Sequence, residues 1–134
     1  MADPGFSELS VKEYEVELIR DMGSRIEYKK GQVVYSPGDS AESIYLVESG
    51  LVRVYRLAGE GRRVTVGSIR GPGELIGLAE ALCGTVRTCF AGAVEDVALI
   101  SVTKEDFINF LSCNPFFLNK VIRILACGMP EVNP

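Results

Sequence analysis

Residues 76–88, with the sequence I-G-L-A-E-A-L-C-G-T-V-R-T, contain the groups best suited to binding a small anion. A glycine turn at Gly77 leads into one predicted helical turn over residues 78–82. A turn of this kind directs several backbone N–H groups toward one place, where an anion can bind. Arg87 adds a planar guanidinium that pairs with phosphate or carboxylate, and Thr88 adds a hydroxyl donor. The segment therefore predicts an anion-binding site.

Each polar side chain of this segment also has a purely structural interpretation. Arg87 could form a surface ion pair with Glu80 or Glu74. Such pairs are common in proteins and contribute little to stability. Thr88 is also an ordinary strand residue. Glu80 is a candidate site residue, but on a helical turn it points roughly 200° away from the side chain at position 78. A solvent-facing or arginine-paired carboxylate is therefore the favoured interpretation of Glu80.

Length and charge limit the class of protein. The chain has 134 residues and a net charge of −4, from 14 basic and 18 acidic residues. This length corresponds to one domain, and the acidic balance argues against a surface devoted to nucleic acid. No apolar run approaches the roughly 20 residues of a membrane span, and the N-terminus lacks the pattern of a signal peptide. We therefore expect a cytoplasmic protein that does not associate with membranes.

The sequence does not predict a metal site or an enzyme. It contains no histidine, and its four cysteines, at positions 83, 89, 113 and 127, form no C-x-x-C pair. These spacings do not suit a zinc or iron–sulfur site, and no nucleophile–base pair is evident. We expect no cofactor and predict that the cysteines are small buried side chains. Cys83 is the one candidate for a reactive thiol, because it lies in the anion-binding segment.

Strands and helices must position this segment. Residues 1–24 predict an acidic helix with a capping box at Ser10 and Glu13. Over residues 25–102, short strands alternate with glycine turns, which favours a closed or sandwich-like antiparallel β-structure. Residues 103–134 predict two helices, the first capped by Thr103 and the second starting at Asn114. The predicted apolar face of the first helix comprises Leu9, Val11, Tyr14, Leu18, Ile19 and Met22, with the acidic residues mainly elsewhere.

Basic residues are concentrated in the middle of the chain. Between positions 53 and 70 five arginines stand against the single acid Glu60, a local excess of +4. A polyanion-binding surface is one interpretation of this pattern. The other is a solvated sheet face, which alternating strands favour. The arginines are Arg53, Arg56, Arg62, Arg63 and Arg70.

Five segments in order resemble the sensory, cyclic-nucleotide-binding domain of Crp/Fnr-type transcription regulators. They are K-G-Q-V-V-Y-S-P-G-D at 30–39, I-Y-L-V-E-S-G at 44–50, R-V-Y-R at 53–56, G-P-G-E-L-I-G at 71–77 and N-P-F-F-L at 114–118. Residues 76–88 resemble the phosphate-binding cassette of that family. The resemblance implies a mainly β fold, a double-stranded β-helix or jelly roll with flanking N- and C-terminal helices. It also implies a long dimerising helix and a DNA-binding helix-turn-helix module. We expect neither within these 134 residues, which would be either a sensory fragment of a longer regulator or a stand-alone, degenerate member of the family.

The resemblance implies roles for the site residues. Arg87 and Thr88 would bind the anionic group of an effector, and Gly77, Leu78 and Ala79 would offer backbone N–H groups. Cyclic-nucleotide binders of the family carry a glutamate directly after this glycine, for the ribose hydroxyl, whereas this chain has Leu78. We therefore expect a small anionic effector, either a cyclic nucleotide or an organic acid such as an aromatic acid. The alternative is a ligand-free degenerate domain that acts in protein–protein interaction, with its apolar final helix forming a homodimer.

Overall fold

The computed structural model describes residues 11–128; the proposed cap Ser10 lies outside them. The helices are α2 (Glu13–Met22), α3 (Leu78–Cys83), α4 (Lys104–Cys113) and α5 (Pro115–Gly128), with a short 3-10 turn, η1 (Gly59–Gly61). The strands are β1 (Ser24–Tyr28), β2 (Val33–Tyr35), β3 (Ser43–Ser49), β4 (Val52–Leu57), β5 (Arg63–Thr65), β6 (Leu75–Ile76), β7 (Phe90–Ala93) and β8 (Val97–Thr103). The strands thus begin and end one residue outside the predicted limits of 25 and 102.

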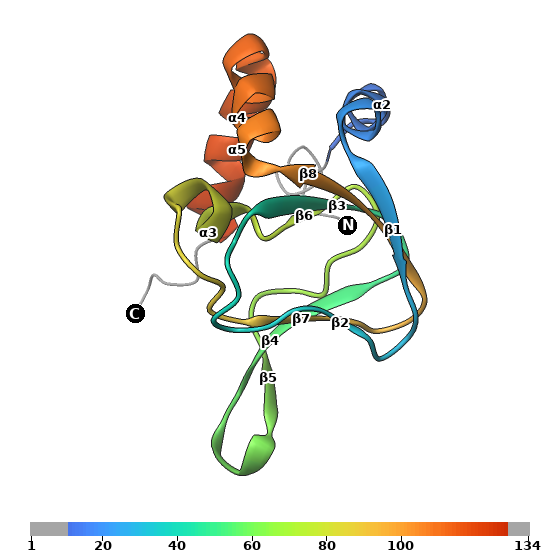
Figure 1. Ribbon diagram of the computed structural model, residues 1–134, viewed down its shortest axis with the longest axis vertical. Helices are drawn as coiled ribbons and strands as arrows, with labels where there is room; N and C mark the ends of the chain where they lie inside the picture. Colours follow the sequence, from blue (N-terminus) through green and yellow to red (C-terminus); the bar gives the residue numbers. More distant parts are fainter. Residues whose placement is uncertain (1–10, 129–134) are drawn as a thin grey trace, which may run out of the picture.

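Two antiparallel sheets form the β-roll. One has the order β1-β8-β3-β6 and the other β2-β7-β4-β5, and Figure 1 shows them facing each other with the helices beside the first sheet. The first sheet is covered on both faces at its inner strand β8. In β8, Leu99 packs between the sheets, whereas Ile100 and Val102 pack against the helices. This explains why β8 is a continuous apolar run rather than an alternating one. The jelly-roll prediction is confirmed.

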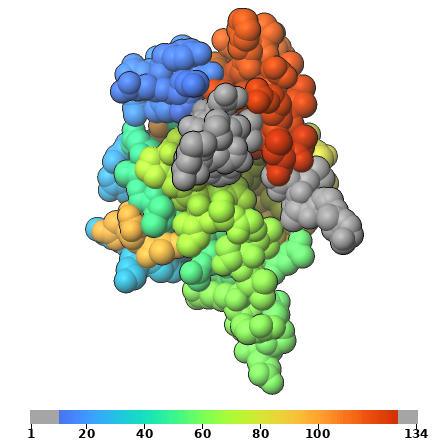
Figure 2. All heavy atoms as spheres, turned by 180° about the vertical axis from the view of Figure 1, so that it is seen from behind, coloured from blue at the N-terminus to red at the C-terminus, as the bar shows by residue number. Residues whose placement is uncertain are grey.

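In the second sheet, one face packs against the interior of the roll and the other face lies on the outside. Val52 and Val54 of β4 belong to the cluster of buried apolar side chains between the sheets. Because side chains alternate along a strand, Arg53 and Tyr55 face the outside of the roll. The β4–β5 hairpin turns at Glu60, whose φ of 65° is left-handed, and it extends away from the rest of the molecule (Figures 1 and 2).

Helix α2 differs from its predicted pattern. Tyr14 and Leu18, assigned to the apolar face, are 65% and 44% exposed. Glu15, assigned to the solvent, is buried instead, and its Oε1 lies 2.7 Å from Lys120 Nζ of α5. Glu15 Oε1 also accepts the backbone N–H of Lys12, at 2.8 Å, and the helix begins at Glu13. The apolar-face prediction is therefore wrong at these positions, because an ion pair with a helix distant in sequence favours burial of the carboxylate.

A second group of ion pairs joins α2 to the first sheet. Glu48 of β3 accepts hydrogen bonds from Arg25 of β1, at 2.7 Å, and from Arg20 of α2, at 2.6 and 3.0 Å. The hydrogen bond from Arg25, and to a lesser extent that from Arg20, lowers the pKa of the Glu48 carboxyl below its ordinary value of 4.5. At the other end of the roll, the Thr103 hydroxyl accepts the N–H of Asp106 and caps α4 as predicted.

Three further findings concern the cysteines, membrane-spanning helices and metal sites. Cys89 alone is buried, and Cys83, Cys113 and Cys127 are exposed, so the prediction of buried cysteines is wrong for three of the four. Within residues 11–128, no helix has the length and apolar character required to cross a bilayer. The same residues contain no group of three or more cysteine, aspartate or glutamate side chains that could hold a metal ion.

Candidate functional site

Arg87 lies inside the fold rather than at its surface. The residue is 2% exposed. Its Nη1 donates to the carbonyl oxygen of Gly77 at 2.8 Å, and its Nη2 donates to the carbonyl oxygen of Ser43. Its guanidinium carbon lies 4.2 Å from the centre of the Tyr35 ring. Backbone carbonyls from two segments and one aromatic face thus hold the guanidinium in a single position.

Gly77 makes this close approach possible. Its φ of 77° is in the left-handed region, which L-residues with a Cβ rarely adopt. A Cβ added there would lie 2.6 Å from Arg87 Nη1. The glycine that the sequence identified as a turn residue therefore also provides the space that the arginine occupies.

The carboxylate of Glu80 occupies the donors predicted for a ligand. Its Oε1 lies 3.4 Å from Arg87 Nη1, and its Oε2 accepts the Thr88 N–H at 3.0 Å and the Thr88 hydroxyl at 2.5 Å. The arginine-paired interpretation of Glu80 is therefore the one observed. The pair is not at the surface, however, because Arg87 is buried and the Glu80 side chain is only 19% exposed. Glu74, the other proposed partner, accepts the N–H of Gly71 instead.

The remaining predicted site residues, at the start of α3, point in different directions. Leu78 is 6% exposed and belongs to the apolar cluster between the first sheet and the helices. Ala79 is exposed. The fold therefore gathers Gly77, Glu80, Arg87 and Thr88, and it directs the Leu78 side chain away from them into the core. A leucine at this position is thus explained by packing.

Tyr35 belongs to the site but was not predicted from the sequence. Burial raises the pKa of its phenol to about 12, so the ring beside Arg87 is neutral at physiological pH. Tyr45 stacks near it, with ring centres 6.2 Å apart. Nothing in the local sequence marks Tyr35, because 52 residues separate it from Arg87 and only the closure of the roll brings them together.

The interior of the roll next to Arg87 is lined by packed side chains. Tyr35, Val47, Ile76, Cys89 and Leu99 are all buried between the two sheets. The group that contacts both Arg87 and Thr88 is the Glu80 carboxylate.

The family of the chain follows from its sequence and fold. The sequence model of the cyclic nucleotide-binding domain family matches residues 25–114. The chain belongs to this family. The cyclic AMP receptor protein of Thermus thermophilus is 32% identical over 119 residues, which are 89% of this chain and 55% of that protein. The nitrogen fixation regulation protein FixK of Rhizobium meliloti is 39% identical over 72 residues, 54% of this chain and 32% of FixK.

The solved structures agree with this assignment. The crystal structure of the Thermus thermophilus catabolite activator protein matches with a TM-score of 0.75 and 32% identity, covering 86% of this chain and 54% of that one. The resemblance to the sensory domain of Crp/Fnr regulators is confirmed. The chain spans about half the length of the Thermus thermophilus receptor protein and about a third of FixK.

Proposed function

We propose that the chain is the effector-sensing domain of a Crp/Fnr-type transcription regulator and binds a small anionic ligand at Arg87 and Thr88. The observation that supports this is the Glu80 carboxylate held between those two residues. A donor set that binds a carboxylate of its own chain has the charge and geometry to bind one from a ligand. In this proposal the protein acts in the cytoplasm without catalysis, and a separate helix-turn-helix domain, not these 134 residues, contacts DNA.

Exchange of the two anions would couple the site to the C-terminal helices. Glu80 lies on α3, which packs against β3 and α4. Leu78 and Ala81 of the same helix share an apolar cluster with Phe107 of α4 and Phe117 of α5. When a ligand replaces Glu80, α3 loses its bonds to Arg87 and Thr88 and can shift against α4. Ligand-bound and ligand-free states then differ in their contacts, as such coupling requires.

An organic acid suits the site better than a cyclic nucleotide. The Leu78 side chain is buried in the core and offers no acceptor to a ribose hydroxyl. A missing charge-assisted hydrogen bond costs about 1.5–3 kcal/mol, or roughly ten- to a hundredfold in affinity. A carboxylate, by contrast, repeats the contacts that Glu80 already makes.

Thermal unfolding with a ligand panel tests the proposal. The panel contains cyclic AMP, cyclic GMP, and small aromatic and dicarboxylic acids. A ligand at 100 times its Kd stabilises the folded chain by about 2.7 kcal/mol, and we expect this from an acid. Thr88→Val removes one donor while keeping the side-chain shape, and it should reduce the stabilisation to about 0.4–1.4 kcal/mol at the same ligand concentration. Thr65→Val, at an exposed site on β5, is the matched control. Equal stabilisation of both variants by the ligand would contradict a binding site at Thr88. Stabilisation by cyclic nucleotides alone would contradict the proposal that the ligand is an organic acid.

A second candidate function is a ligand-free domain that forms a homodimer. Two observations favour it: Glu80 already satisfies the anion donors, and α5 exposes large apolar side chains. Phe116 is 89% exposed and Ile122 is 55% exposed. Sedimentation without ligand should then show a concentration-dependent dimer, and Phe116→Ser should weaken it. A monomer at all concentrations would remove this candidate.

A further inference from the structure

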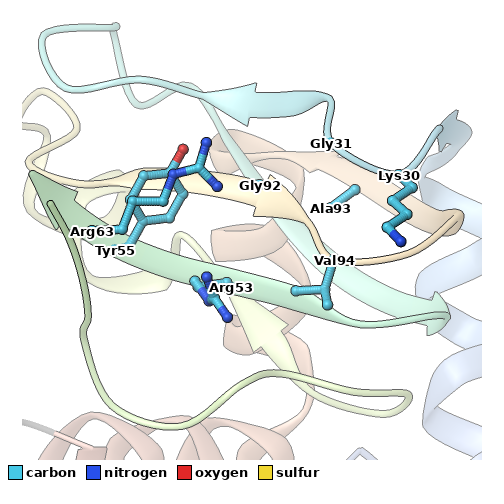
Figure 3. Close-up of a pocket in the computed structure, with 8 residues that line it drawn as sticks. All are labelled: Lys30, Gly31, Arg53, Tyr55, Arg63, Gly92, Ala93 and Val94. Carbon is cyan, nitrogen blue, oxygen red and sulfur yellow. The ribbon is translucent and has the colours of Figure 1, made fainter. Parts of the chain in front are cut away.

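A basic pocket lies on the outer face of the second sheet, separate from the Arg87 site. Its volume is about 210 Å³, and Lys30, Arg53, Tyr55, Arg63 and Gly92 are among the residues that line it. In Figure 3, Arg53 lies on β4 between Lys30 and the stacked pair of Arg63 and Tyr55. The pocket faces away from the roll interior because Val52 and Val54, the neighbours of Arg53, point inward.

The charge of this pocket is not compensated by the fold. Lys30, Arg53 and Arg63 contribute three positive charges, and no acidic residue is among its lining residues. Over residues 11–128, none of these three side chains forms an ion pair with a carboxylate, whereas Arg20, Arg25 and Arg87 each do. The nearby Asp96 carboxylate accepts the backbone N–H of Lys30, at 2.9 Å, and forms an ion pair with Lys29 instead.

The Arg53 side chain carries a buried donor without an acceptor. Its Nε is buried and has no hydrogen-bond partner among the described residues. Leaving a charged donor buried and unpaired is unfavourable. An oxyanion in the pocket would supply the missing negative charge to this guanidinium through its other N–H groups.

Tyr55 fixes the position of the second guanidinium. Its ring stacks on Phe90, with centres 5.1 Å apart, and the Arg63 guanidinium carbon lies 5.1 Å from the Tyr55 ring centre. Gly92 is paired with Arg53 across the strands, and a Cβ there would lie 3.3 Å from the Tyr55 ring. Stacking on an aromatic face leaves the N–H edges of Arg63 available to an anion. The absence of a Cβ at Gly92 therefore leaves room for the Tyr55 ring.

We propose that this pocket binds a small ligand through a phosphate or pyrophosphate group. Three cations are enough to neutralise such a group, whose charge is about −1.5 to −2 for a single phosphate at pH 7. Two guanidiniums and an ammonium offer more donors than a single carboxylate can accept. The volume is smaller than the roughly 300 Å³ at which pockets for whole drug-sized ligands begin, so it suits the charged group rather than a complete large ligand.

Calorimetric titration of the 134-residue chain with inorganic pyrophosphate at physiological ionic strength tests this site. We expect saturable binding of one pyrophosphate per chain. Arg53→Gln and Arg63→Gln should each weaken it roughly ten- to a hundredfold, the value of a charge-assisted hydrogen bond. Arg56→Gln is the matched control, because Arg56 lies on the same strand, is exposed and does not line the pocket. Thr88→Val should also leave the affinity unchanged, which distinguishes this pocket from the Arg87 site.

Three outcomes would overturn the proposal. The first is no saturable binding of pyrophosphate. The second is equal weakening by Arg56→Gln, which would indicate a diffuse effect of positive charge. The third is binding of duplex DNA that depends on Arg53 but is not displaced by pyrophosphate. Arg63 is exposed, so Arg63→Gln is expected to fold and keeps the test valid if Arg53→Gln does not.

Discussion

Replacement of Glu80 by alanine tests whether its carboxylate acts as an internal substitute for a ligand. The variant leaves Arg87, which is 2% exposed, without its carboxylate, but with the carbonyl oxygens of Gly77 and Ser43 and the Tyr35 ring. Removal of one partner from a buried ion pair costs about 3–5 kcal/mol. The expected cost here is lower, because the 3.4 Å separation is long and Glu80 is 19% exposed. With the Thr88 bonds lost as well, we expect a loss of about 2 kcal/mol in the free energy of unfolding.

The same interaction sets how strongly Glu80 competes with an added anion. A contribution of about 2 kcal/mol corresponds to roughly thirtyfold weaker binding of a carboxylate to the native chain than to the variant. Acetate should therefore restore stability to Glu80→Ala, by about 1.4 kcal/mol at ten times its Kd. At the same concentration it should leave the native chain nearly unchanged.

Urea unfolding with sodium acetate, compared with sodium chloride at equal ionic strength, measures both effects. Glu74→Ala is the matched control, because Glu74 bonds to Gly71 and not to Arg87. The reasoning is refuted if Glu80→Ala unfolds at the same urea concentration as the native chain. It is also refuted if acetate stabilises the native chain and both variants equally.

Three further predictions concern the stability of the fold. Gly77→Ala places a Cβ 2.6 Å from Arg87 Nη1 at a left-handed φ, and should lower the free energy of unfolding by about 1–3 kcal/mol; a urea midpoint equal to the native one would contradict this. Lys120→Ala leaves the buried Glu15 without its ion-pair partner, and should lower the free energy of unfolding by about 3 kcal/mol. A loss below about 1 kcal/mol, the value of an exposed ion pair, would show that this pair adds little to stability. Because the pKa of Glu48 is lowered in the folded chain, its contribution is complete above pH 4.5 and disappears as the pH falls further. Glu48→Gln should therefore lose up to about 1 kcal/mol at pH 7 and match the native chain in acid; a difference that persists in acid would be inconsistent with this origin.

Local sequence patterns predicted most of the fold. Glycine turns between short apolar strands predicted an antiparallel β architecture, the family resemblance implied the β-roll, and Thr103 and Asn114 marked the starts of α4 and α5. The errors lie in α2, where Glu15 is buried and Tyr14 is exposed. Helical periodicity assigns faces from residue type alone, and it cannot include an ion-pair partner that lies 105 residues away.

The candidate site shows the same division. The sequence by itself determined the glycine turn at Gly77, the presence of Arg87 and Thr88 at the end of the segment, and the absence of a glutamate at Leu78. Only the tertiary structure decided that the guanidinium is buried against Tyr35 and Ser43 and that Glu80 occupies the anion donors. The physical reason is that turn and strand preferences act between neighbours in the chain, whereas burial and charge pairing depend on which distant segments the closed roll brings into contact.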